Sequence, residues 1–147
     1  LSKEFKEMVS NVDFVQDNQS KSSYGVLRGL HFQNPPHEQS KLVRVLKGRI
    51  QDIAVDLRSY SETYKKYVSV ILDDKSNNQL FIPKGCAHGF VVLSKEAIVS
   101  YKVDEVYNPV LDNGYRYDDP NFNINWNVNK KEIILSDKDK KLPFLSD

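Results

Sequence analysis

Apolar and polar residues alternate along most of the chain with the two-residue period that is typical of β-strands. The clearest case is residues 49–58, RIQDIAVDLR, which place Ile53 and Val55 on one face and Asp52 and Asp56 on the other. Alternation of this kind predicts a strand with one buried and one exposed face. We therefore expect the face with the two aspartates to be turned to solvent; the alternative is a barrel that holds a ligand between its sheets.

Further short runs of β-branched and aromatic residues follow at close spacing, at 67–72, 79–83, 89–94 and 97–103. Clusters of Gly, Pro, Asn, Asp and Ser separate these runs, as expected of turns. No long helical pattern is interleaved with them, so the strands are expected to pair in antiparallel fashion. The pattern predicts an all-β sandwich or barrel, with a jelly roll as the natural closed form.

The two ends of the chain depart from the strand pattern. Residues 2–10 place Phe5 and Met8 at helical spacing behind Ser2, a residue type that caps helices, and this predicts one short amphipathic helix. The C-terminal third is rich in Asn, Asp and Lys, which predicts loops around Trp126 and a short tail with little regular structure.

Length and composition narrow the class of protein. The 147 residues, 39% of them hydrophobic, predict one domain spanning residues 1–147. Because 21 basic and 20 acidic residues leave a net charge of +1, neither nucleic acid nor an anionic membrane surface is an expected partner. No apolar stretch approaches the roughly 18 residues of a membrane span. The chain begins at Leu1 rather than Met, so we expect it to lack an N-terminal portion.

Residues that commonly bind metals are few. The single cysteine, Cys86, excludes an internal disulfide and a four-cysteine zinc site, and it suits a reducing, cytoplasmic environment. The histidines are His31, His37 and His88. Jelly-roll metalloenzymes commonly place two histidines two residues apart on one strand, but the position two beyond His31 is Gln33. We therefore expect no bound metal, and we assign no role to His37, which lies in a loop sequence.

A histidine can also act as an acid–base catalyst without a metal. His31 in RGLHFQ and His88 in IPKGCAHGF are flanked by Gly and apolar residues, a context in which structural histidines are more common than catalytic ones. A histidine base needs a carboxylate partner and a proton donor across the substrate, and the carboxylates and eight tyrosines of the chain include both types. Arg28, Lys41 and Arg44 are either charge partners for a phosphate or an enolate, or solvated strand-edge charges. These residues alone predict a β barrel with a polar pocket and leave its function undecided.

Several ordered blocks of sequence resemble one known family. They are GVLRGLHFQ…KLVRV (25–45), the pattern GxIxDxAVDLRxxSxTY (48–64), QLFIPKGCAHGFVVLS (79–94) and YKVDEVYNP (101–109), followed by a weaker match in LSDKD (135–139). Together they are similar to the dTDP-4-dehydrorhamnose 3,5-epimerase family over most of the chain. The resemblance implies a cupin-type double-stranded β-helix with short helical and loop segments at its ends. It also implies a homodimer that exchanges N-terminal strands.

The resemblance implies an activity as well. Members of the family invert C3 and C5 of a dTDP-linked 4-keto-6-deoxy sugar without a cofactor, as part of dTDP-L-rhamnose synthesis for cell-surface polysaccharides. By this resemblance His31 is the base that removes the proton next to the keto group, Asp139 is its orienting carboxylate, and Tyr101 is the acid on the opposite face. Lys41 and His88 face the carbonyl oxygen and stabilise the enolate.

The remaining implied site residues bind the substrate. Arg28 and the QDN sequence hold the sugar and diphosphate, one tyrosine stacks on the thymine, and two charged residues border the site. These residues are Gln16, Asp17, Asn18, Arg28, Tyr107, Asp112 and Lys138. Binding energy from the nucleotide would orient the sugar for reaction.

The chain departs from the family pattern at a few positions. Asp112 stands where the family more often has Glu, Cys86 replaces a usual Phe or Tyr, and Tyr117 replaces a usual Trp. The family's N-terminal segment, which contacts the neighbouring subunit's nucleotide, has no counterpart here. Asp52 and Asp56 also match family positions, but we expect them to be structural partners for Arg58 or the backbone and leave them out of the catalytic set.

The alternatives to a 3,5-epimerase come from two classes. One is an epimerase that inverts only C3 or only C5, or that acts on another nucleotide 4-keto sugar. The other is a cupin that binds a sugar without catalysis, which would be expected to lack His31, Tyr101 or Asp139. All three residues are present, which favours an enzyme.

Overall fold

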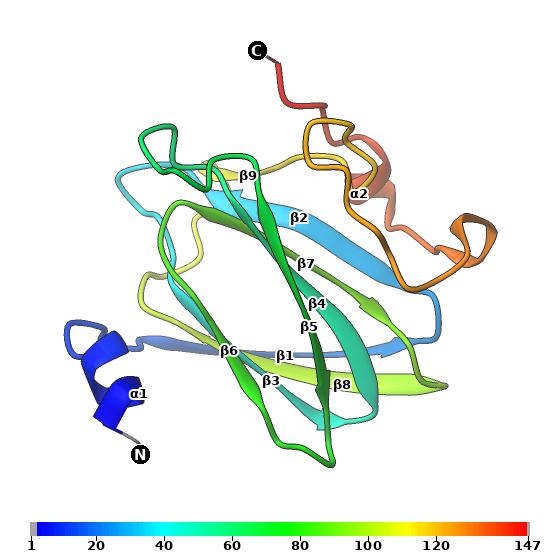
Figure 1. Ribbon diagram of the computed structural model, residues 1–147, viewed down its shortest axis with the longest axis horizontal. Coiled ribbons are helices and arrows are strands. Elements are labelled where there is room, and N and C mark those ends of the chain that lie inside the picture. The colour runs from blue at the N-terminus through cyan, green and yellow to red at the C-terminus, as the bar shows by residue number, and fades with distance from the viewer. Residues whose placement is uncertain (1–2, 147) are drawn as a thin grey trace.

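The computed structural model describes residues 3–146, and most of its regular structure is β-strand (Figure 1). Two antiparallel sheets face each other. One has the strand order β1 (Gln16–Ser23), β8 (Glu96–Val103), β3 (Lys41–Lys47) and β6 (Gln79–Ile82). The other has the order β5 (Tyr67–Asp73), β4 (Arg49–Asp56), β7 (Cys86–Val92), β2 (Leu27–Gln33) and β9 (Asp112–Gly114). The predicted all-β jelly roll is confirmed.

A core of branched and aromatic side chains joins the two sheets. The first sheet contributes residues from β3, β6 and β8, and the second contributes residues from β4, β5 and β7. The buried members are Val43, Val45, Ile50, Leu72, Ile82, Cys86, Phe90, Val92, Ala97 and Val99. Because side chains on a strand alternate between its two faces, the residues between these core positions point to the outer faces of the sheets.

Both faces of β4 are buried, which differs from the expectation. Ile53 and Val55 pack against Phe122 of the C-terminal segment on the outer face of the sheet. Asp52 and Asp56 are also buried, on the face that is directed between the sheets. The expectation that the aspartate face is exposed to solvent is therefore wrong, because the four-stranded sheet covers that face and the C-terminal segment covers the other.

Asp56 is a structural residue that organises the loop after β4. Its carboxylate accepts hydrogen bonds from the Arg58 guanidinium at 2.8 and 2.9 Å and from the hydroxyls of Ser61 and Thr63, both at 2.6 Å. The Arg58 contact is the main reason that the pKa of Asp56 lies well below its usual range. The expected pairing of Asp56 with Arg58 is confirmed.

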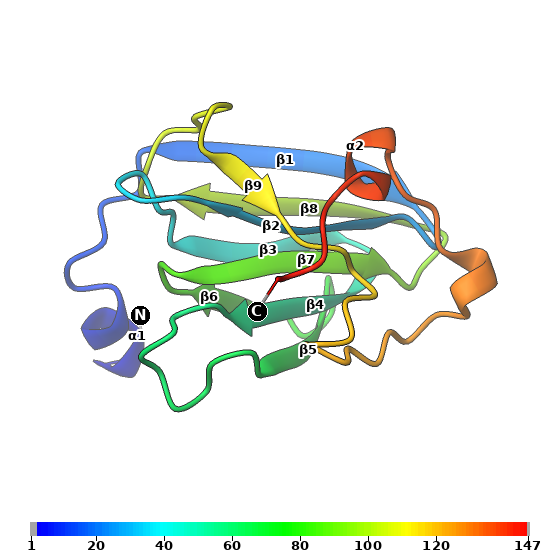
Figure 2. The same cartoon turned by 90° about the horizontal axis from the view of Figure 1, so that it is seen from above.

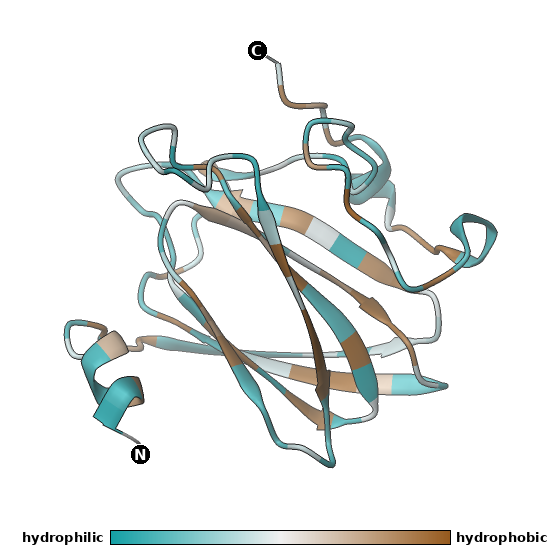
Figure 3. Cartoon of the chain, viewed as in Figure 1, coloured by the Kyte–Doolittle hydropathy of each residue, from teal (hydrophilic) through white to brown (hydrophobic). Residues whose placement is uncertain are grey.

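The predicted N-terminal helix is present as α1 (Lys3–Met8). The predicted cap, Ser2, lies outside the described residues. None of the residues of α1 is buried, and most of this helix has the colour of hydrophilic residues in Figure 3. No helix within residues 3–146 is long and apolar enough to cross a membrane.

The C-terminal third forms loops around Trp126, as predicted, and covers the outer face of the five-stranded sheet. The Trp126 indole donates a hydrogen bond to the Tyr117 carbonyl at 2.9 Å, and the ring packs in two of the apolar clusters on this face. The segment also contains a 3₁₀ helix, η1 (Lys130–Glu132), and the short helix α2 (Asp137–Lys140). Figures 1 and 2 show α2 and η1 at the opposite end of the barrel from α1.

Candidate active site

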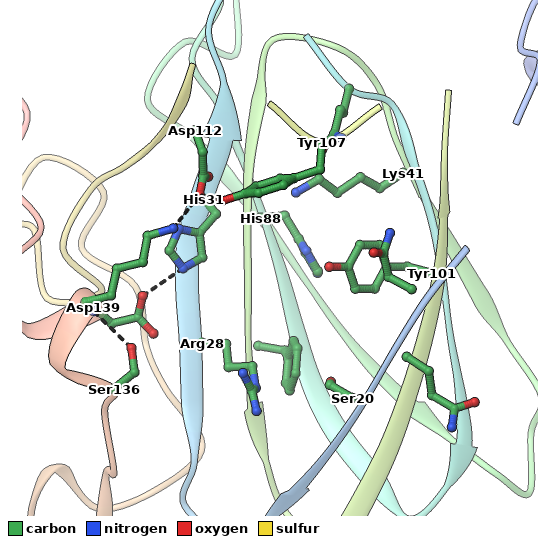
Figure 4. Close-up of a pocket in the computed structure, with 15 residues that line it drawn as sticks. Ser20, Arg28, His31, Lys41, His88, Tyr101, Tyr107, Asp112, Ser136 and Asp139 are labelled. Atoms are coloured by element: carbon green, nitrogen blue, oxygen red, sulfur yellow. Dashed lines mark hydrogen bonds and ion pairs between the residues drawn. The ribbon is translucent and has the colours of Figure 1, made fainter. Parts of the chain in front are cut away.

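A cavity of about 380 Å³ lies between the two sheets, within the size range of small-molecule sites. Both sheets, the loop before β9 and α2 contribute to its walls (Figure 4). It is lined by Asn18, Gln19, Ser20, Arg28, His31, Gln39, Lys41, His88, Phe90, Tyr101, Tyr107, Asp112, Ser136, Lys138 and Asp139. The structure thus brings together every sequence-predicted site residue except Gln16 and Asp17.

A bulge in β2 lets Arg28 and His31 face the same cavity. Residues three apart on a regular strand point to opposite faces, but the pairing of β2 with β7 shifts register between these two residues. Gly29 lies within the shift with φ of +112°, and a Cβ at this position would lie 2.5 Å from the carbonyl oxygen of His88. Only glycine permits this conformation and this close approach.

His31 pairs with a carboxylate that comes from the far end of the chain. Its Nε2 lies 2.7 Å from Oδ1 of Asp139 on α2, and the Ser136 hydroxyl caps this helix by accepting from the Asp139 N–H at 3.1 Å. Burial opposes ionisation of Asp139, but its hydrogen bonds with His31, Ser136 and the Gly29 backbone hold its pKa below the usual value. The other ring nitrogen of His31, Nδ1, has no hydrogen-bond partner within residues 3–146. Nδ1 is itself buried, so the pair combines a carboxylate at one ring nitrogen with a second ring nitrogen that is unpartnered, and these are the elements of a His–Asp general base.

A second His–Asp pair lies deeper between the sheets. His88 Nε2 is 2.6 Å from Oδ1 of Asp52, and both side chains are buried. The two residues lie on the neighbouring strands β4 and β7, where Asp52 is opposite Phe90 and Ala54 is opposite His88. The sequence reasoning missed Asp52 as a site residue. The sequence did contain one indication of its burial, because Asp52 shares a face of the strand with Ile50. When strands close into a barrel, one face of each strand must become buried.

Lys41 and Tyr101 form the wall opposite His31 (Figure 4). The Lys41 ammonium lies 6.0 Å from the centre of the Tyr101 ring, and the His88 and Tyr101 rings are 6.4 Å apart. Burial lowers the pKa of Lys41 to about 8, against the opposing charges of Asp112 and Asp52. Burial also raises the pKa of Tyr101, so its phenol remains protonated at neutral pH. This wall therefore presents the Lys41 ammonium, which loses its proton only slightly above neutral pH, and the protonated phenol of Tyr101.

Three predicted binding residues meet at the mouth of the cavity. The Tyr107 hydroxyl donates to Asp112 at 2.9 Å, and the same Asp112 oxygen forms an ion pair with Lys138 of α2. The bond to Asp112 is the main reason that the pKa values of both Tyr107 and Lys138 lie above their usual ranges. The Asp112 carboxylate therefore links the loop before β9 to the helix that carries Asp139.

The QDN sequence of β1 divides between the two faces of its sheet. Asn18 lines the cavity, whereas Asp17 points away from it and pairs with Lys102 at 2.7 Å. Gln16 does not line the cavity, but its side chain donates to Asn18 Oδ1 at 2.8 Å and accepts from the Tyr107 N–H at 3.1 Å. The structure thus does not bring Asp17 into the site, because neighbouring residues on a strand face opposite sides.

The cavity also includes residues that the sequence reasoning did not select. Gln19, Ser20, Gln39, Phe90 and Ser136 line it, and no motif in the sequence distinguished them from ordinary strand or loop residues. Within residues 3–146, no three His, Cys, Asp or Glu side chains come together in a way that could hold a metal ion. The absence of a metal cofactor stays a prediction.

Comparison with known proteins identifies relatives over nearly the whole chain. The family model described as dTDP-4-dehydrorhamnose 3,5-epimerase matches residues 1–147. The enzyme of that name from Methanothermobacter thermautotrophicus is 50% identical over 137 residues, which cover 92% of this chain and 74% of the relative. The one from Shigella flexneri is 49% identical over 138 residues, covering 93% and 75%.

Solved structures agree with this similarity. The crystal structure of dTDP-4-dehydrorhamnose 3,5-epimerase from Elizabethkingia anophelis has a TM-score of 0.92 and 47% identity, and the match covers 97% of this chain and 78% of that one. A 3,5-epimerase from Legionella pneumophila in complex with dTDP-4-keto-L-rhamnose has a TM-score of 0.90 and 42% identity, with coverage of 98% and 76%. Sequence, fold and cavity agree, and this chain belongs to the dTDP-4-dehydrorhamnose 3,5-epimerase family.

Proposed function

We propose that this protein is a dTDP-4-dehydrorhamnose 3,5-epimerase, an isomerase that inverts C3 and C5 of a dTDP-linked 4-keto-6-deoxyhexose without a cofactor. The observation that carries the proposal is the pair of opposed walls in the cavity. The carboxylate-backed His31 lies on one side, and the protonated Tyr101 lies on the other. Inversion at a carbon requires a base and an acid on opposite faces of the substrate, and these two walls supply them.

The reaction begins with loss of a proton from a carbon next to the keto group. His31 takes this proton, and the electron pair of the C–H bond moves into the carbonyl to form an enolate. Lys41 and the Asp52-paired His88 stabilise the negative charge on the oxygen. Tyr101 then donates its proton to the same carbon from the opposite face, which restores the ketone with inverted configuration. Exchange with water returns the proton to Tyr101 and removes it from His31.

The nucleotide part of the substrate supplies binding energy. Arg28 is anchored by the Ser22 hydroxyl at 3.1 and 3.2 Å and is suited to bind the diphosphate. Tyr107 at the cavity mouth stacks on the thymine, while Asn18, Asp112 and Lys138 border the sugar and nucleotide. Such remote contacts fix the sugar between His31 and Tyr101 without taking part in the proton transfers.

The experiment that tests this proposal is incubation of the protein with the dTDP-4-keto-6-deoxy sugar in D₂O. We expect deuterium at both C3 and C5 of the product, and the absence of exchange at both carbons would contradict an epimerase and favour a sugar-binding cupin. Exchange at one carbon alone would indicate a monoepimerase, like the 3'-monoepimerase of Streptomyces bikiniensis, which is 27–28% identical to this chain. Relatives at 43–50% identity are named 3,5-epimerases, which supports inversion at both carbons.

We further propose that residues 1–147 form one domain, that it acts in the cytoplasm as a homodimer, and that its product enters cell-surface polysaccharide. The buried free thiol of Cys86 is compatible with a reducing compartment. Leu42, Leu46 and Phe81 lie partly exposed on the outer face of the four-stranded sheet, which supports a surface for a second copy. Sedimentation of the protein at micromolar concentration would test the homodimer, and a monomer would contradict it. Elemental analysis is expected to find no stoichiometric metal.

A further inference from the structure

Tyr107 lies at the cavity mouth with little packing to fix its ring. The side chain is 50% exposed, and its hydroxyl donates a hydrogen bond to Asp112. Its neighbours Val106 and Val110 are more exposed still. The position of the ring over the cavity therefore depends on how the backbone around Tyr107 is held.

A buried glutamine holds that backbone on both sides of the tyrosine. Gln33, at the end of β2, is only 4% exposed. Its amide oxygen accepts from the Asn108 N–H at 2.7 Å, and its amide nitrogen donates to the Val106 carbonyl at 3.4 Å and the His37 carbonyl at 2.6 Å. Gln33 thus binds the backbone of Val106 and Asn108, which directly precede and follow Tyr107. One side chain therefore fixes the path of this loop relative to the strand that carries His31.

The Tyr107 backbone itself is held by a second glutamine from the opposite sheet. Gln16 of β1 accepts from the Tyr107 N–H at 3.1 Å. This contact is at the surface, whereas those of Gln33 are shielded from water, where an unsatisfied amide costs more. Water can replace Gln16 at small cost, but loss of the Gln33 amide removes the hydrogen bonds that it makes to the Asn108 N–H and the His37 carbonyl.

We propose that Gln33 is a positioning residue that holds Tyr107 over the nucleotide end of the site. The inference rests on the proposed function, in which Tyr107 stacks on the thymine. Gln33 lies two residues from His31 on the same strand, so the strand that presents the base also sets the position of the nucleotide contact. Replacement of Gln33 is expected to weaken nucleotide binding through Tyr107, with little change in the proton-transfer steps.

The chain offers a matched control in Gln51. This glutamine is also buried, and it also clamps a loop: it donates to the Asn125 carbonyl at 2.9 Å and accepts from the Asn127 N–H at 2.6 Å. Those contacts lie on the outer face of the five-stranded sheet, away from the cavity. Gln51→Leu and Gln33→Leu therefore remove equivalent amides, and only Gln33→Leu disturbs the loop of Tyr107.

The test is the affinity of the full chain for dTDP, measured by calorimetry for wild type, Gln33→Leu, Tyr107→Ala, the double variant and Gln51→Leu. Because stacking of a base on an aromatic ring strengthens binding, we expect Tyr107→Ala to weaken dTDP binding about 5- to 150-fold. Gln33→Leu should weaken it to a similar extent, and the double variant should be no weaker than Tyr107→Ala alone. Gln51→Leu should lower the melting temperature and bind dTDP as wild type does.

Three results would overturn the inference: wild-type affinity in Gln33→Leu, effects of Gln33→Leu and Tyr107→Ala that multiply in the double variant, or an equal loss of affinity in Gln51→Leu. Kinetics with the keto sugar add a second readout, since Gln33→Leu is expected to raise KM and to leave the pH profile of kcat unchanged. A wild-type protein that binds dTDP but does not turn over the keto sugar would contradict the proposed reaction instead. The dTDP measurements would still decide the role of Gln33.

Discussion

The two His–Asp pairs of the cavity are built in opposite ways. His88 and Asp52 come from neighbouring strands, and their side chains are 7% and 0% exposed. His31 is 25% exposed, and its partner Asp139 comes from a four-residue helix near the C-terminus. The first pair is fixed by the register of the sheet, whereas the second depends on a segment that docks onto it.

This difference matches the chemistry proposed for each histidine. A base that exchanges its proton in every catalytic cycle needs an unpartnered nitrogen, and Nδ1 of His31 has no hydrogen-bond partner within residues 3–146 while the side chain as a whole is 25% exposed. A residue that only stabilises a developing charge acts best when it is rigid and shielded from water, as His88 is. The pair that includes a residue of the C-terminal helix is thus the one proposed to transfer the proton.

The largest effect is expected from replacing the proposed base. His31→Asn should lower kcat by about 10²–10⁴-fold, because the substrate proton then has no acceptor. Deuterium exchange at C3 and C5 should fall by the same factor. His88→Asn serves as the comparison and should retain more exchange than His31→Asn. Equal exchange in the two variants would contradict the assignment of His31 as the base.

The second effect concerns the stability of the fold. Here the His88–Asp52 pair should matter more than the His31–Asp139 pair, whereas for activity the His31–Asp139 pair should matter more. Asp52→Ala leaves His88 buried without its partner, and we expect it to lower the free energy of unfolding by about 3 kcal/mol. Asp139 is also buried but comes from a four-residue helix that docks onto the sheet, so Asp139→Ala should destabilise the protein less, while it lowers kcat. Urea denaturation of both variants measures the difference. A larger loss of stability for Asp139→Ala would contradict the comparison.

The third effect is a loss of activity in alkaline solution. With a pKa of about 8, Lys41 is positively charged below pH 8 and becomes neutral as the pH rises through this value. We therefore expect kcat/KM to fall about tenfold for each pH unit above 8, because the enolate loses its cation. A pH profile of wild type measures this, with Lys41→Met as the reference. If kcat/KM of Lys41→Met still falls above pH 8 as it does in wild type, the assignment of this fall to Lys41 is contradicted.

The smallest effect tests the link between α2 and the cavity mouth. Lys138→Met removes the ion pair with Asp112 and loosens the helix that carries Asp139. Because a partly exposed ion pair contributes about 0.2–1 kcal/mol, we expect kcat to fall up to about fivefold. Lys140→Met is the control, since Lys140 lies on the same helix and pairs with the exposed Asp137. Identical losses in both variants would indicate a general effect on helix charge.

The strands were predictable from the sequence, since alternation and turn residues mark most of them. Alternation could not tell which face of a strand lies between the sheets, and this is why Asp52 was expected in solvent. Asp139 lies in SDKDKK, a run whose composition is typical of a solvated tail, and only the resemblance selected it. In the sequence, Gln33 was considered only as the position where a second metal-binding histidine is absent. Its positioning role could not be predicted, because it depends on contacts to loops that are distant in sequence.

The measurement that tests the central claim most directly is the stereochemistry of exchange in Tyr101→Phe. If His31 and Tyr101 act on opposite faces of the sugar, this variant keeps the base and loses the acid. Incubated with the keto sugar in D₂O, it should introduce deuterium with retained configuration, because the proton can return only from the side of His31. Inversion at the wild-type rate in Tyr101→Phe would contradict the account.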